Sequence, residues 1–352
     1  MSHIQIDRVG KVFGGTSALD DLSVDIDRGE FFGLLGPSGC GKTTTLRLLA
    51  GFLSSTSGHI RFGERDVTDV PTEQRNIGMV FQSYALFPHL TTGENVAFGL
   101  VARKIPKPEQ KERVEAALSL VDLEGFGDRP IGELSGGQQQ RTALARAIVV
   151  EPELLLLDEP LSNLDAKLRA QTGNEIRSLQ RRLGITTIYV THDQDEAMTL
   201  CDRFAVLKEG RLQQTGSPDL VYSKPVNRFV ADFLGGANLV EVTSAVKTDE
   251  GFLTSSQGTQ LRFEALPPNQ LGALAIRPHH VVIDDSSDLS QNSILGSVLA
   301  VRFTGADVEY EVDTTLRVFR IQRRFDARAV VFSVGDLVRL YLPPEHLWPV
   351  MP

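Results

Sequence analysis

The sequence predicts an α/β layer fold followed by a small all-β domain, and three observations lead to this prediction. From Ile4 to about Gly235, strand-like and helix-like segments alternate, as they do where helices pack on a sheet. A glycine-rich loop at residues 36–43 joins an apolar strand to a helix. After Gly235-Gly236, short β-rich runs broken by Gly, Pro, Asn and Asp replace the helix-like segments. We therefore expect domains at residues 1–236 and 237–352, each large enough to bury its own core.

Apolar runs in the first domain predict buried strands, and segments with helical periodicity predict helices. The strands are Phe31–Leu35, Leu154–Leu157, Thr186–Val190 and Phe204–Leu207. The helices are Lys42–Ala50, Glu109–Val121, Gln139–Val150 and Ala166–Leu183. In the second domain the predicted strands are Leu261–Phe263, Ala275–Ile276, Val281–Ile283, Ser297–Phe303, Tyr310–Val312, Val318–Ile321 and Val338–Leu342. Together these later strands predict a small β-barrel.

Composition argues against several function classes. An apolar fraction of 41% and a charged fraction of 23% are typical of a compact globular protein. The formal net charge of -9, with no dense run of Lys and Arg, would repel a polyphosphate backbone, so we expect no nucleic-acid partner. The two cysteines, Cys40 and Cys201, are too few for a disulfide framework and lack metal-site spacing, which fits a reducing cytosol.

Sequence features also bear on location. The start, Met1-Ser2-His3-Ile4, lacks the charged leader and apolar stretch of a secretion signal. The longest apolar runs, such as Leu154–Leu157, are far shorter than the ~20 residues that span a bilayer as a helix. We expect the chain to stay inside the cell and to reach a membrane only through partners.

The glycine-rich loop predicts a phosphate-binding site. Its residues fit the pattern G-x-x-x-x-G-K-[ST] between a strand and a helix, which is the context that the pattern requires. Its glycines allow successive N–H groups to point inward, and the helix N-terminus adds positive potential. Lys42 can reach terminal phosphates, and Thr43 offers a hydroxyl to Mg²⁺. The predicted nucleotide-binding residues here are Gly36, Pro37, Ser38, Gly39, Cys40, Gly41, Lys42, Thr43 and Thr44.

Two alternatives accompany this loop. The pattern taken alone also fits a glycine-rich turn that merely precedes a helix. Cys40 lies near a helix N-terminus, which lowers the pKa of a thiol and could make it reactive. A phosphate loop needs no nucleophile of its own, so we interpret Cys40 as a small loop residue.

Two acids follow the apolar run Leu154–Leu157. Parallel sheets bind ligands beyond the carboxyl ends of their strands, which places Asp158 and Glu159 at such an end. Asp158 is predicted to orient Mg²⁺, and Glu159 is the candidate general base that polarises the attacking water. Asp-Glu-Pro after a strand could also be only a solvated turn.

A third motif, Leu134-Ser135-Gly136-Gly137-Gln138, decides between these alternatives. Together with the phosphate loop and Asp158-Glu159, it resembles the signature of the ATP-binding cassette family over roughly residues 4–235. The resemblance implies a phosphate-loop NTPase with a RecA-like core, an antiparallel β subdomain, and a helical subdomain at about residues 85–150. Further matches follow in the family's order at Gln82, at Ser162-Asn163-Leu164-Asp165 and at His192.

The signature residues Ser135, Gly136, Gly137 and Gln138 stand at the start of a helix predicted to begin near Gln138, which makes a second anion-binding helix terminus. In the family this terminus faces the nucleotide held by the other protomer. The resemblance therefore implies a head-to-tail homodimer that encloses two ATP molecules and hydrolyses them only when closed. Closure would exclude water and stabilise the charge that develops during phosphoryl transfer.

Four further roles come from the resemblance. His192 is expected to contact the γ-phosphate and to hold Glu159, although an isolated His after a strand is more often a capping or surface residue. Asp165 is expected to couple the two sites across the dimer, and it could also be a plain helix N-cap. Phe13 is expected to stack on adenine, with a core role as the alternative. Gln82 is expected to bridge Mg²⁺ and the segment that follows it.

The segment Ser83–Leu90 is apolar and aromatic. By resemblance it receives a short helix from a transmembrane permease subunit, two of which are expected as partners, and this would place the chain on the cytoplasmic face of the membrane. Leu86 and Phe87 could instead fill the local core. The sequence of Phe81–His89 and the C-terminal β domain resemble those of importer ATPases for polyamines, ferric iron and sugars. We rank a polyamine or ferric ion importer above a sugar importer, with a separate solute-binding protein acting indirectly.

The last domain resembles the family's oligonucleotide-fold-like regulatory domain, notably at Ala275–His279 and Phe303–Tyr310. His279 stands where the family commonly carries Glu. Two other readings remain open: a soluble cassette ATPase acting in translation or DNA repair, and a regulatory protein whose C-terminal barrel binds a metabolite or oxyanion. The first usually carries two cassettes or a long coiled coil, and this sequence shows neither.

Overall fold

The computed structural model describes residues 2–284 and 291–352. The chain forms two compact units, Met1–Pro218 and Asp219–Pro352. Each unit is described by itself below. Within the described ranges, no helix is both long and apolar enough to cross a membrane.

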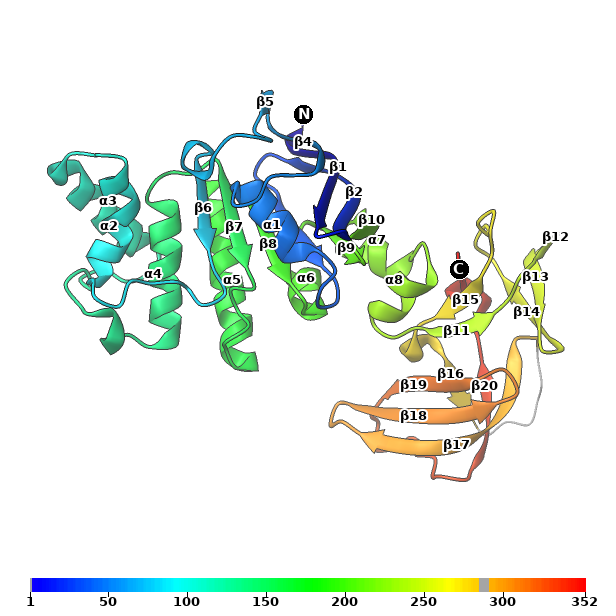
Figure 1. The fold of residues 1–352 in the computed structure, drawn as a ribbon. Helices are drawn as coiled ribbons and strands as arrows, with labels where there is room; N and C mark the ends of the chain where they lie inside the picture. Colours follow the sequence, from blue (N-terminus) through cyan, green and yellow to red (C-terminus); the bar gives the residue numbers. More distant parts are fainter. Residues whose placement is uncertain (1, 285–290) are drawn as a thin grey trace. The chain divides into compact units, whose positions relative to one another are not determined.

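A six-stranded sheet forms the centre of the first unit, in the order β10-β9-β3-β8-β7-β6 (Figure 1). All neighbouring strands in it run parallel except the pair of β9 and β10. Every residue of β3 and β8 is buried, because helices and loops cover both faces of a parallel sheet. The strands are β3 (Phe31–Leu35), β6 (Ile77–Val80), β7 (Leu154–Asp158), β8 (Thr186–Thr191), β9 (Arg203–Lys208) and β10 (Arg211–Gly216).

Helices α1 (Lys42–Ala50) and α6 (Gln194–Leu200) contact strands of the central sheet, and α5 (Ala166–Leu183) packs on α6. Helices α2 (Thr92–Ala102), α3 (Lys107–Leu120) and α4 (Gly136–Ile148) pack on one another, and α4 also contacts β6. In Figure 1 the strands β6 and β7 lie between α4 and α1.

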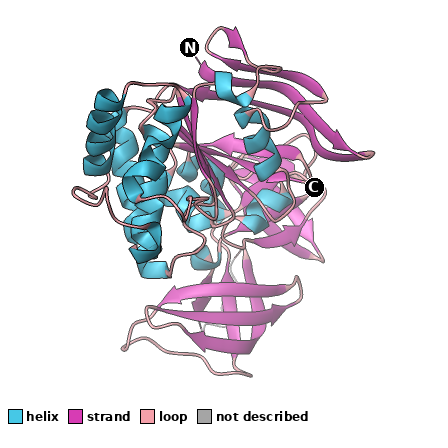
Figure 2. Cartoon of the chain, turned by 60° about the vertical axis from the view of Figure 1, so that its left-hand side comes forward, coloured by secondary structure: helices cyan, strands magenta, loops and turns pink. Residues whose placement is uncertain are grey.

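A second sheet of the first unit is antiparallel, in the order β2-β1-β4-β5. Alternate residues of β2 face the core, as expected for a sheet with one solvated face. Figure 2 shows its long strands near the N-terminus, reaching beyond the helices. The strands are β1 (Ser2–Phe13), β2 (Thr16–Asp27), β4 (Ser57–Phe62) and β5 (Arg65–Asp66). Short 3₁₀ turns are η1 (Thr72–Gln74) and η2 (Ile131–Glu133).

The second unit consists mainly of short antiparallel strands in three sheets, ordered β11-β15-β21, β12-β13-β14 and β16-β20-β17-β18-β19. Its largest hydrophobic cluster includes Val298, Tyr310, Phe319 and Leu340. The strands are β11 (Asn238–Glu241), β12 (Val246–Thr248), β13 (Gly251–Ser256), β14 (Thr259–Phe263), β15 (Ala273–Ile276), β16 (Val282–Asp284), β17 (Ser293–Phe303), β18 (Asp307–Thr314), β19 (Val318–Arg324), β20 (Leu337–Tyr341) and β21 (Trp348–Val350). The helical segments are α7 (Pro218–Ser223), α8 (Arg228–Phe233), η3 (Pro278–His280) and η4 (Pro344–His346).

The predicted fold class is confirmed, and the predicted elements are close to the observed ones. The predicted bounds of β3, α1 and α5 are correct. The predicted start of α4 is wrong, because this helix begins at Gly136. Ser135 and Gln138 form a reciprocal capping box there, and this cap outweighs the low helix propensity of two glycines.

Candidate functional site

The predicted site residues follow neighbouring strands of the central sheet. The phosphate loop follows β3, His192 follows β8, and Glu159 follows β7. Leu35 pairs with Thr191, and Asp158 pairs with Val190, so the three strand ends lie at one edge of the sheet. Ligands of open α/β sheets bind at such an edge.

The phosphate loop has a backbone that only glycine can form at two places. Gly36 has φ 158°, and a Cβ there would lie 2.3 Å from the carbonyl oxygen of Leu207. Gly41 has φ 105°, and its Cβ would lie 2.6 Å from Leu19 Cδ2. The loop thus depends on close backbone approach.

Lys42 lies inside this loop. Its side chain is 5% exposed, and its ammonium donates to the carbonyl oxygens of Gly36 at 2.7 Å and Pro37 at 3.1 Å. Helix α1 has no side-chain cap at Gly41 and no acidic residue in its first turn. An uncapped helix N-terminus beside a buried cation fits a polyphosphate. Burial raises the pKa of the Cys40 thiol, which favours the interpretation of Cys40 as a loop residue.

The residues proposed to hold Mg²⁺ suit a cation that takes its remaining ligands from a bound nucleotide. Burial and, secondly, the neighbouring Glu159 raise the pKa of Asp158, while Arg47 and Lys42 lower it. A half-buried carboxylate next to another carboxylate favours a nearby cation. Among the described residues, no group of three or more His, Cys, Asp or Glu side chains could hold a metal by itself. This donor set suits Mg²⁺, which is usually bound by one or two carboxylates together with phosphate oxygens.

Glu159, His192 and Gln82 meet at one oxygen atom. Glu159 Oε2 lies 3.1 Å from His192 Nδ1 and accepts a hydrogen bond from Gln82 Nε2 at 3.4 Å. Glu159 has a positive φ of 44°, an uncommon conformation for this residue type, and its N–H donates to Val190 at 3.0 Å. The structure therefore brings three separate motifs together around one carboxylate.

The segment after the two acids approaches the same place. Asn163 Nδ2 donates to the carbonyl oxygen of Gln82 at 2.9 Å. Asp165 is the N-cap of α5, and its Oδ1 accepts hydrogen bonds from the N–H groups of Lys167 and Leu168. The helix-cap alternative for Asp165 is thus confirmed, and it leaves Asp165 Oδ2 for another contact.

The signature motif forms the exposed start of α4. Ser135 Oγ accepts from Gln138 N at 3.4 Å, and Gln138 Oε1 accepts from Ser135 N at 2.9 Å. A Cβ added at Gly136 or Gly137 would meet no heavy atom within 4 Å. The space in front of this helix terminus is open.

Phe13 ends β1, where its side chain is 45% exposed. The ammonium of Lys11 lies 5.0 Å from the centroid of its ring. The alternative that Phe13 fills the core is wrong, because nearly half of the side chain faces solvent.

Two side chains that the sequence interpretation missed hold the segment after Gln82. The guanidinium of Arg146 on α4 donates to the carbonyl oxygens of Tyr84 and Ala85, each at 2.7 Å. The amide of Asn95, 0% exposed, accepts from Phe87 N at 2.8 Å and donates to Phe87 O at 3.1 Å. No local pattern signals these contacts, because the Arg146 partners lie 61 and 62 residues away in sequence.

Aromatic side chains gather next to this segment. The rings of Phe87 and Phe98 are 4.5 Å apart, and those of Phe52 and Phe81 are 6.2 Å apart. Phe52 is 49% exposed and Phe98 is 48% exposed. Phe87 itself is half-buried, so this surface is both packed and accessible.

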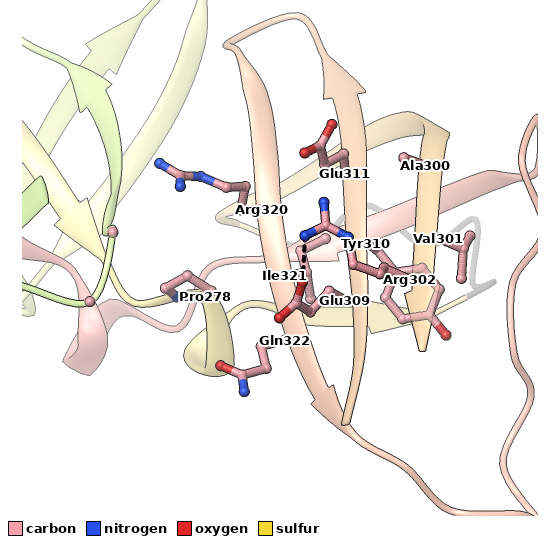
Figure 3. Close-up of a pocket in the computed structure, with 12 residues that line it drawn as sticks. Pro278, Ala300, Val301, Arg302, Glu309, Tyr310, Glu311, Arg320, Ile321 and Gln322 are labelled. Carbon is pink, nitrogen blue, oxygen red and sulfur yellow. Dashed lines mark ion pairs between the residues drawn. The ribbon is translucent and has the colours of Figure 1, made fainter. Parts of the chain in front are cut away.

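A cavity of about 470 Å³ lies within the second unit (Figure 3). Figure 3 shows the polar side chains of β18 and β19, including Glu309, Glu311 and Arg320, on the sheet surface that lines it. Arg302 and Glu309 form an ion pair at 3.5 Å in this wall. The cavity is lined by none of the motif residues of the first unit.

Comparisons with known proteins identify the family of the chain. A family model described as ABC transporter matches residues 19–162, and one described as TOBE domain matches residues 274–350. The chain is 48% identical to the Fe(3+) ions import ATP-binding protein FbpC of Rhizobium etli over 97% of this chain and 93% of that protein. It is also 48% identical to the spermidine/putrescine import ATP-binding protein PotA of Rubrobacter xylanophilus, over 87% of this chain and 82% of that protein.

Solved structures give the same result for the first unit. CbiO1 of Clostridium perfringens, part of an ABC transporter complex, aligns with a TM-score of 0.59 and 34% identity over 63% of this chain and 90% of its own. The ATP-binding cassette MJ0796, solved as a dimer bound to ADP and Pi, aligns with a TM-score of 0.54 and 31% identity over 61% of this chain and 98% of its own. The chain therefore belongs to the ABC transporter family, as an ATP-hydrolysing subunit with an OB-like TOBE domain in its C-terminal part.

Proposed function

We propose that the chain is the motor subunit of an importer, and that closure of a head-to-tail dimer on two ATP molecules drives solute uptake. The observation that carries this proposal is the meeting of Gln82, Glu159 and His192 at one carboxylate oxygen beside the phosphate loop. Relatives that match most of this chain are named as import proteins, which supports the direction of transport.

Within one subunit, residues of three strand ends prepare ATP for hydrolysis. The loop Gly36–Thr44 binds the phosphates, and Lys42 exchanges its bonds to Gly36 and Pro37 for bonds to the terminal phosphates. Glu159 accepts the proton of the attacking water, and His192 holds Glu159 and the γ-phosphate in line. Mg²⁺, when bound, neutralises phosphate charge, and Thr43, Gln82 and Asp158 would hold it.

The second half of each site comes from the partner subunit. Ser135, Gly136, Gly137 and Gln138 present the N-terminus of α4 to the γ-phosphate bound by the other copy. Asp165 reaches the facing site with the oxygen that does not cap α5. Phe13, exposed at the end of β1, stacks on adenine. The dimeric MJ0796 cassette supports this arrangement.

The aromatic surface beside residues 83–90 is the proposed contact with the two permease subunits. Its exposed rings, Phe52 and Phe98, offer apolar area to a short helix. Arg146 and Asn95 fix the backbone of the segment, so the surface is preformed. The chain would then lie on the cytoplasmic face of the membrane and act with an external solute-binding protein only indirectly.

We propose ferric iron or a polyamine as the solute. The FbpC and PotA relatives are equally identical to this chain at 48%, so identity does not separate the two. We assign residues 1–236 to the ATPase domain, with its helical subdomain at about residues 85–150, and residues 237–352 to a regulatory β domain. The compact units divide nearby, after Pro218.

Reconstituted vesicles test this function. The chain would be co-expressed with candidate permease subunits, and ATP-dependent uptake of labelled Fe³⁺ and of labelled spermidine would be measured. We expect uptake of one of the two, and no uptake with Glu159→Gln. Binding to ribosomes or DNA ends without any association with permease subunits would instead favour the soluble cassette reading.

A further inference from the structure

A buried network lies beneath His192. Glu196 of α6 is 8% exposed, and its Oε2 accepts from the Tyr189 hydroxyl at 2.7 Å and from the Thr191 hydroxyl at 2.6 Å. Burial and the Glu196 carboxylate raise the pKa of Tyr189 well above its ordinary value, so this hydroxyl stays protonated and donates. Strand β8, which leads to His192, is thus anchored by a buried carboxyl group.

Both neighbours of His192 are fixed. Thr191 Oγ accepts from Asp193 N at 2.9 Å. Asp193 Oδ1 accepts from Asp195 N at 2.8 Å and from Glu196 N at 3.2 Å, which caps α6. His192 itself is 57% exposed and lies 3.1 Å from Glu159. The position of its ring therefore depends on the backbone at residues 191 and 193.

One guanidinium joins this network to the segment that ends at Asp165. Arg169 of α5 donates to Asp193 Oδ2 at 2.8 Å and to the carbonyl oxygen of Leu164 at 3.2 Å. Its Nε lies 3.7 Å from Glu196 Oε1 and is buried without a hydrogen-bond partner. Three partners around a planar fork suit Arg, whereas Lys could satisfy only part of this geometry.

The network borders the reacting groups directly. A cavity of about 10 Å³ is lined by Glu159 and His192 together with Arg169 and Glu196. A space of this size is close to that of a single water molecule. A movement of Arg169 or Glu196 would therefore change the shape of the cavity that Glu159, the candidate base, also lines.

We propose that Arg169 and Glu196 are positioning residues for His192, and that Arg169 couples the Asp165 segment to the His192 segment of the same subunit. This inference rests on the proposed role of His192 in hydrolysis. Glu196 holds strand β8 from below, and Arg169 holds Asp193 from the side. A change at Asp165 when the partner subunit arrives is then transmitted through Leu164 and Arg169 to the residue next to His192.

The first experiment compares Arg169→Met, Arg169→Lys and Glu196→Gln in the full chain. Arg177→Met is the matched control, because Arg177 lies on the same helix and forms an ion pair with Asp202 away from His192. We expect Arg169→Met to lower kcat about tenfold, which is less than the ~10²-fold that a 1 Å misplacement of a catalytic group can cost, with an unchanged KM for ATP. Arg169→Lys should recover part of kcat, and Glu196→Gln, which keeps an acceptor for the hydroxyls, should lose less. Arg177→Met should lower the melting temperature and keep kcat.

Equal losses of kcat in Arg169→Met and Arg177→Met, in proportion to their melting temperatures, would overturn the inference. So would a loss in Arg169→Met that appears only in KM. Either result would mean that Arg169 is an ordinary structural ion pair.

A double-mutant cycle with His192→Ala separates this inference from the proposed function. If Arg169 acts through His192, adding Arg169→Met to His192→Ala should leave the single-turnover rate unchanged. A full further loss in the double variant would refute the coupling and leave the role of His192 intact. Wild-type activity in His192→Ala alone would refute the proposed role of His192, and the inference with it.

Discussion

The first unit contains two helix N-termini that lie in phosphate-binding motifs, and they differ in what satisfies their N–H groups. Helix α1 begins at Lys42 without any side-chain cap, inside a loop whose lysine is 5% exposed. Helix α4 begins at Gly136 behind a complete capping box, and its first turn faces open space. The α1 terminus can thus bind an anion that is held by its own subunit. The other already satisfies part of its own donors and faces outward.

This difference explains why hydrolysis should need two copies of the chain. An uncapped terminus binds phosphate without displacing a side-chain cap, so α1 can hold ATP in an isolated subunit. At α4 the Ser135 cap must yield to the ligand, at a cost on the order of 1 kcal/mol, which only a well-placed partner site can offset. We therefore expect substitutions at the α1 terminus to change ATP binding, and substitutions at the α4 terminus to change hydrolysis.

The largest expected effect is that of Glu159→Gln. The amide cannot accept the proton of the attacking water, and loss of a general base lowers rates by about 10²–10⁴-fold. ATP binding at α1 should be unchanged, and the ATP-bound dimer should accumulate in size-exclusion chromatography. Glu153→Gln, at an exposed position just before the same strand, is the control. A Glu159→Gln variant that stays monomeric and fully active would contradict this assignment.

Lys42→Ala should have the next largest effect, and it tests the enclosed terminus. Loss of charge-assisted bonds to phosphate costs about 1.5–3 kcal/mol, which corresponds to a roughly 10- to 150-fold weaker Kd for ATP. Fluorescent ATP titration of the isolated chain measures this change. Lys111→Ala on the exposed face of α3 is the control, since Lys111 contacts only Glu115 at 3.9 Å among the ion pairs of the described residues. Unchanged ATP affinity would remove Lys42 from the phosphate site.

Ser135→Ala tests the open terminus. We expect kcat to fall about tenfold, because one hydrogen bond to a charged group is lost, while ATP affinity of the monomer stays the same. Thr91→Ala is a matched control, since Thr91 forms the same capping box with Glu94 on α2. Both variants lose a helix cap, so only Ser135→Ala should lower kcat beyond its effect on the melting temperature. Weaker ATP binding by the isolated Ser135→Ala chain would break the distinction between the two helix ends.

Gly136→Ala should have the smallest of these effects on the isolated chain, and its effect is measured on folding because Gly136 itself belongs to the proposed nucleotide site. Alanine in the first turn of α4 meets no atom within 4 Å and should raise the free energy of unfolding by about 0.5–1 kcal/mol. Gly36→Ala is the contrasting variant, because its Cβ would lie 2.3 Å from Leu207 O, and it should lower stability. Urea unfolding measures both values. Destabilisation by Gly136→Ala would show that the α4 terminus is more enclosed than its geometry indicates.

Local patterns predicted the parts of the site that are contiguous in sequence. The loop of residues 36–43, the acids Asp158-Glu159 and the helix at Ala166 follow from short motifs and caps. The contacts of Arg146 and Arg169 could not be predicted, because their partners are set by tertiary packing. Arg277 gives the same lesson in the second unit. It stood inside a recognised motif, yet its donation to the carbonyl oxygen of Ala231 at 2.8 Å, which ties α8 to the β strands, depends on packing.

The two hydrogen bonds of Arg146 have a mechanical consequence. Tyr84 lies two residues after Gln82, and its carbonyl is held by the same helix whose first residue follows Ser135. The hydrogen bonds of Arg146 therefore connect the segment after Gln82, and the aromatic surface beside it, to α4. A movement of Gln82 is therefore expected to be passed on to α4, and loss of the two Arg146 hydrogen bonds is expected to let α4 and the segment after Gln82 move independently.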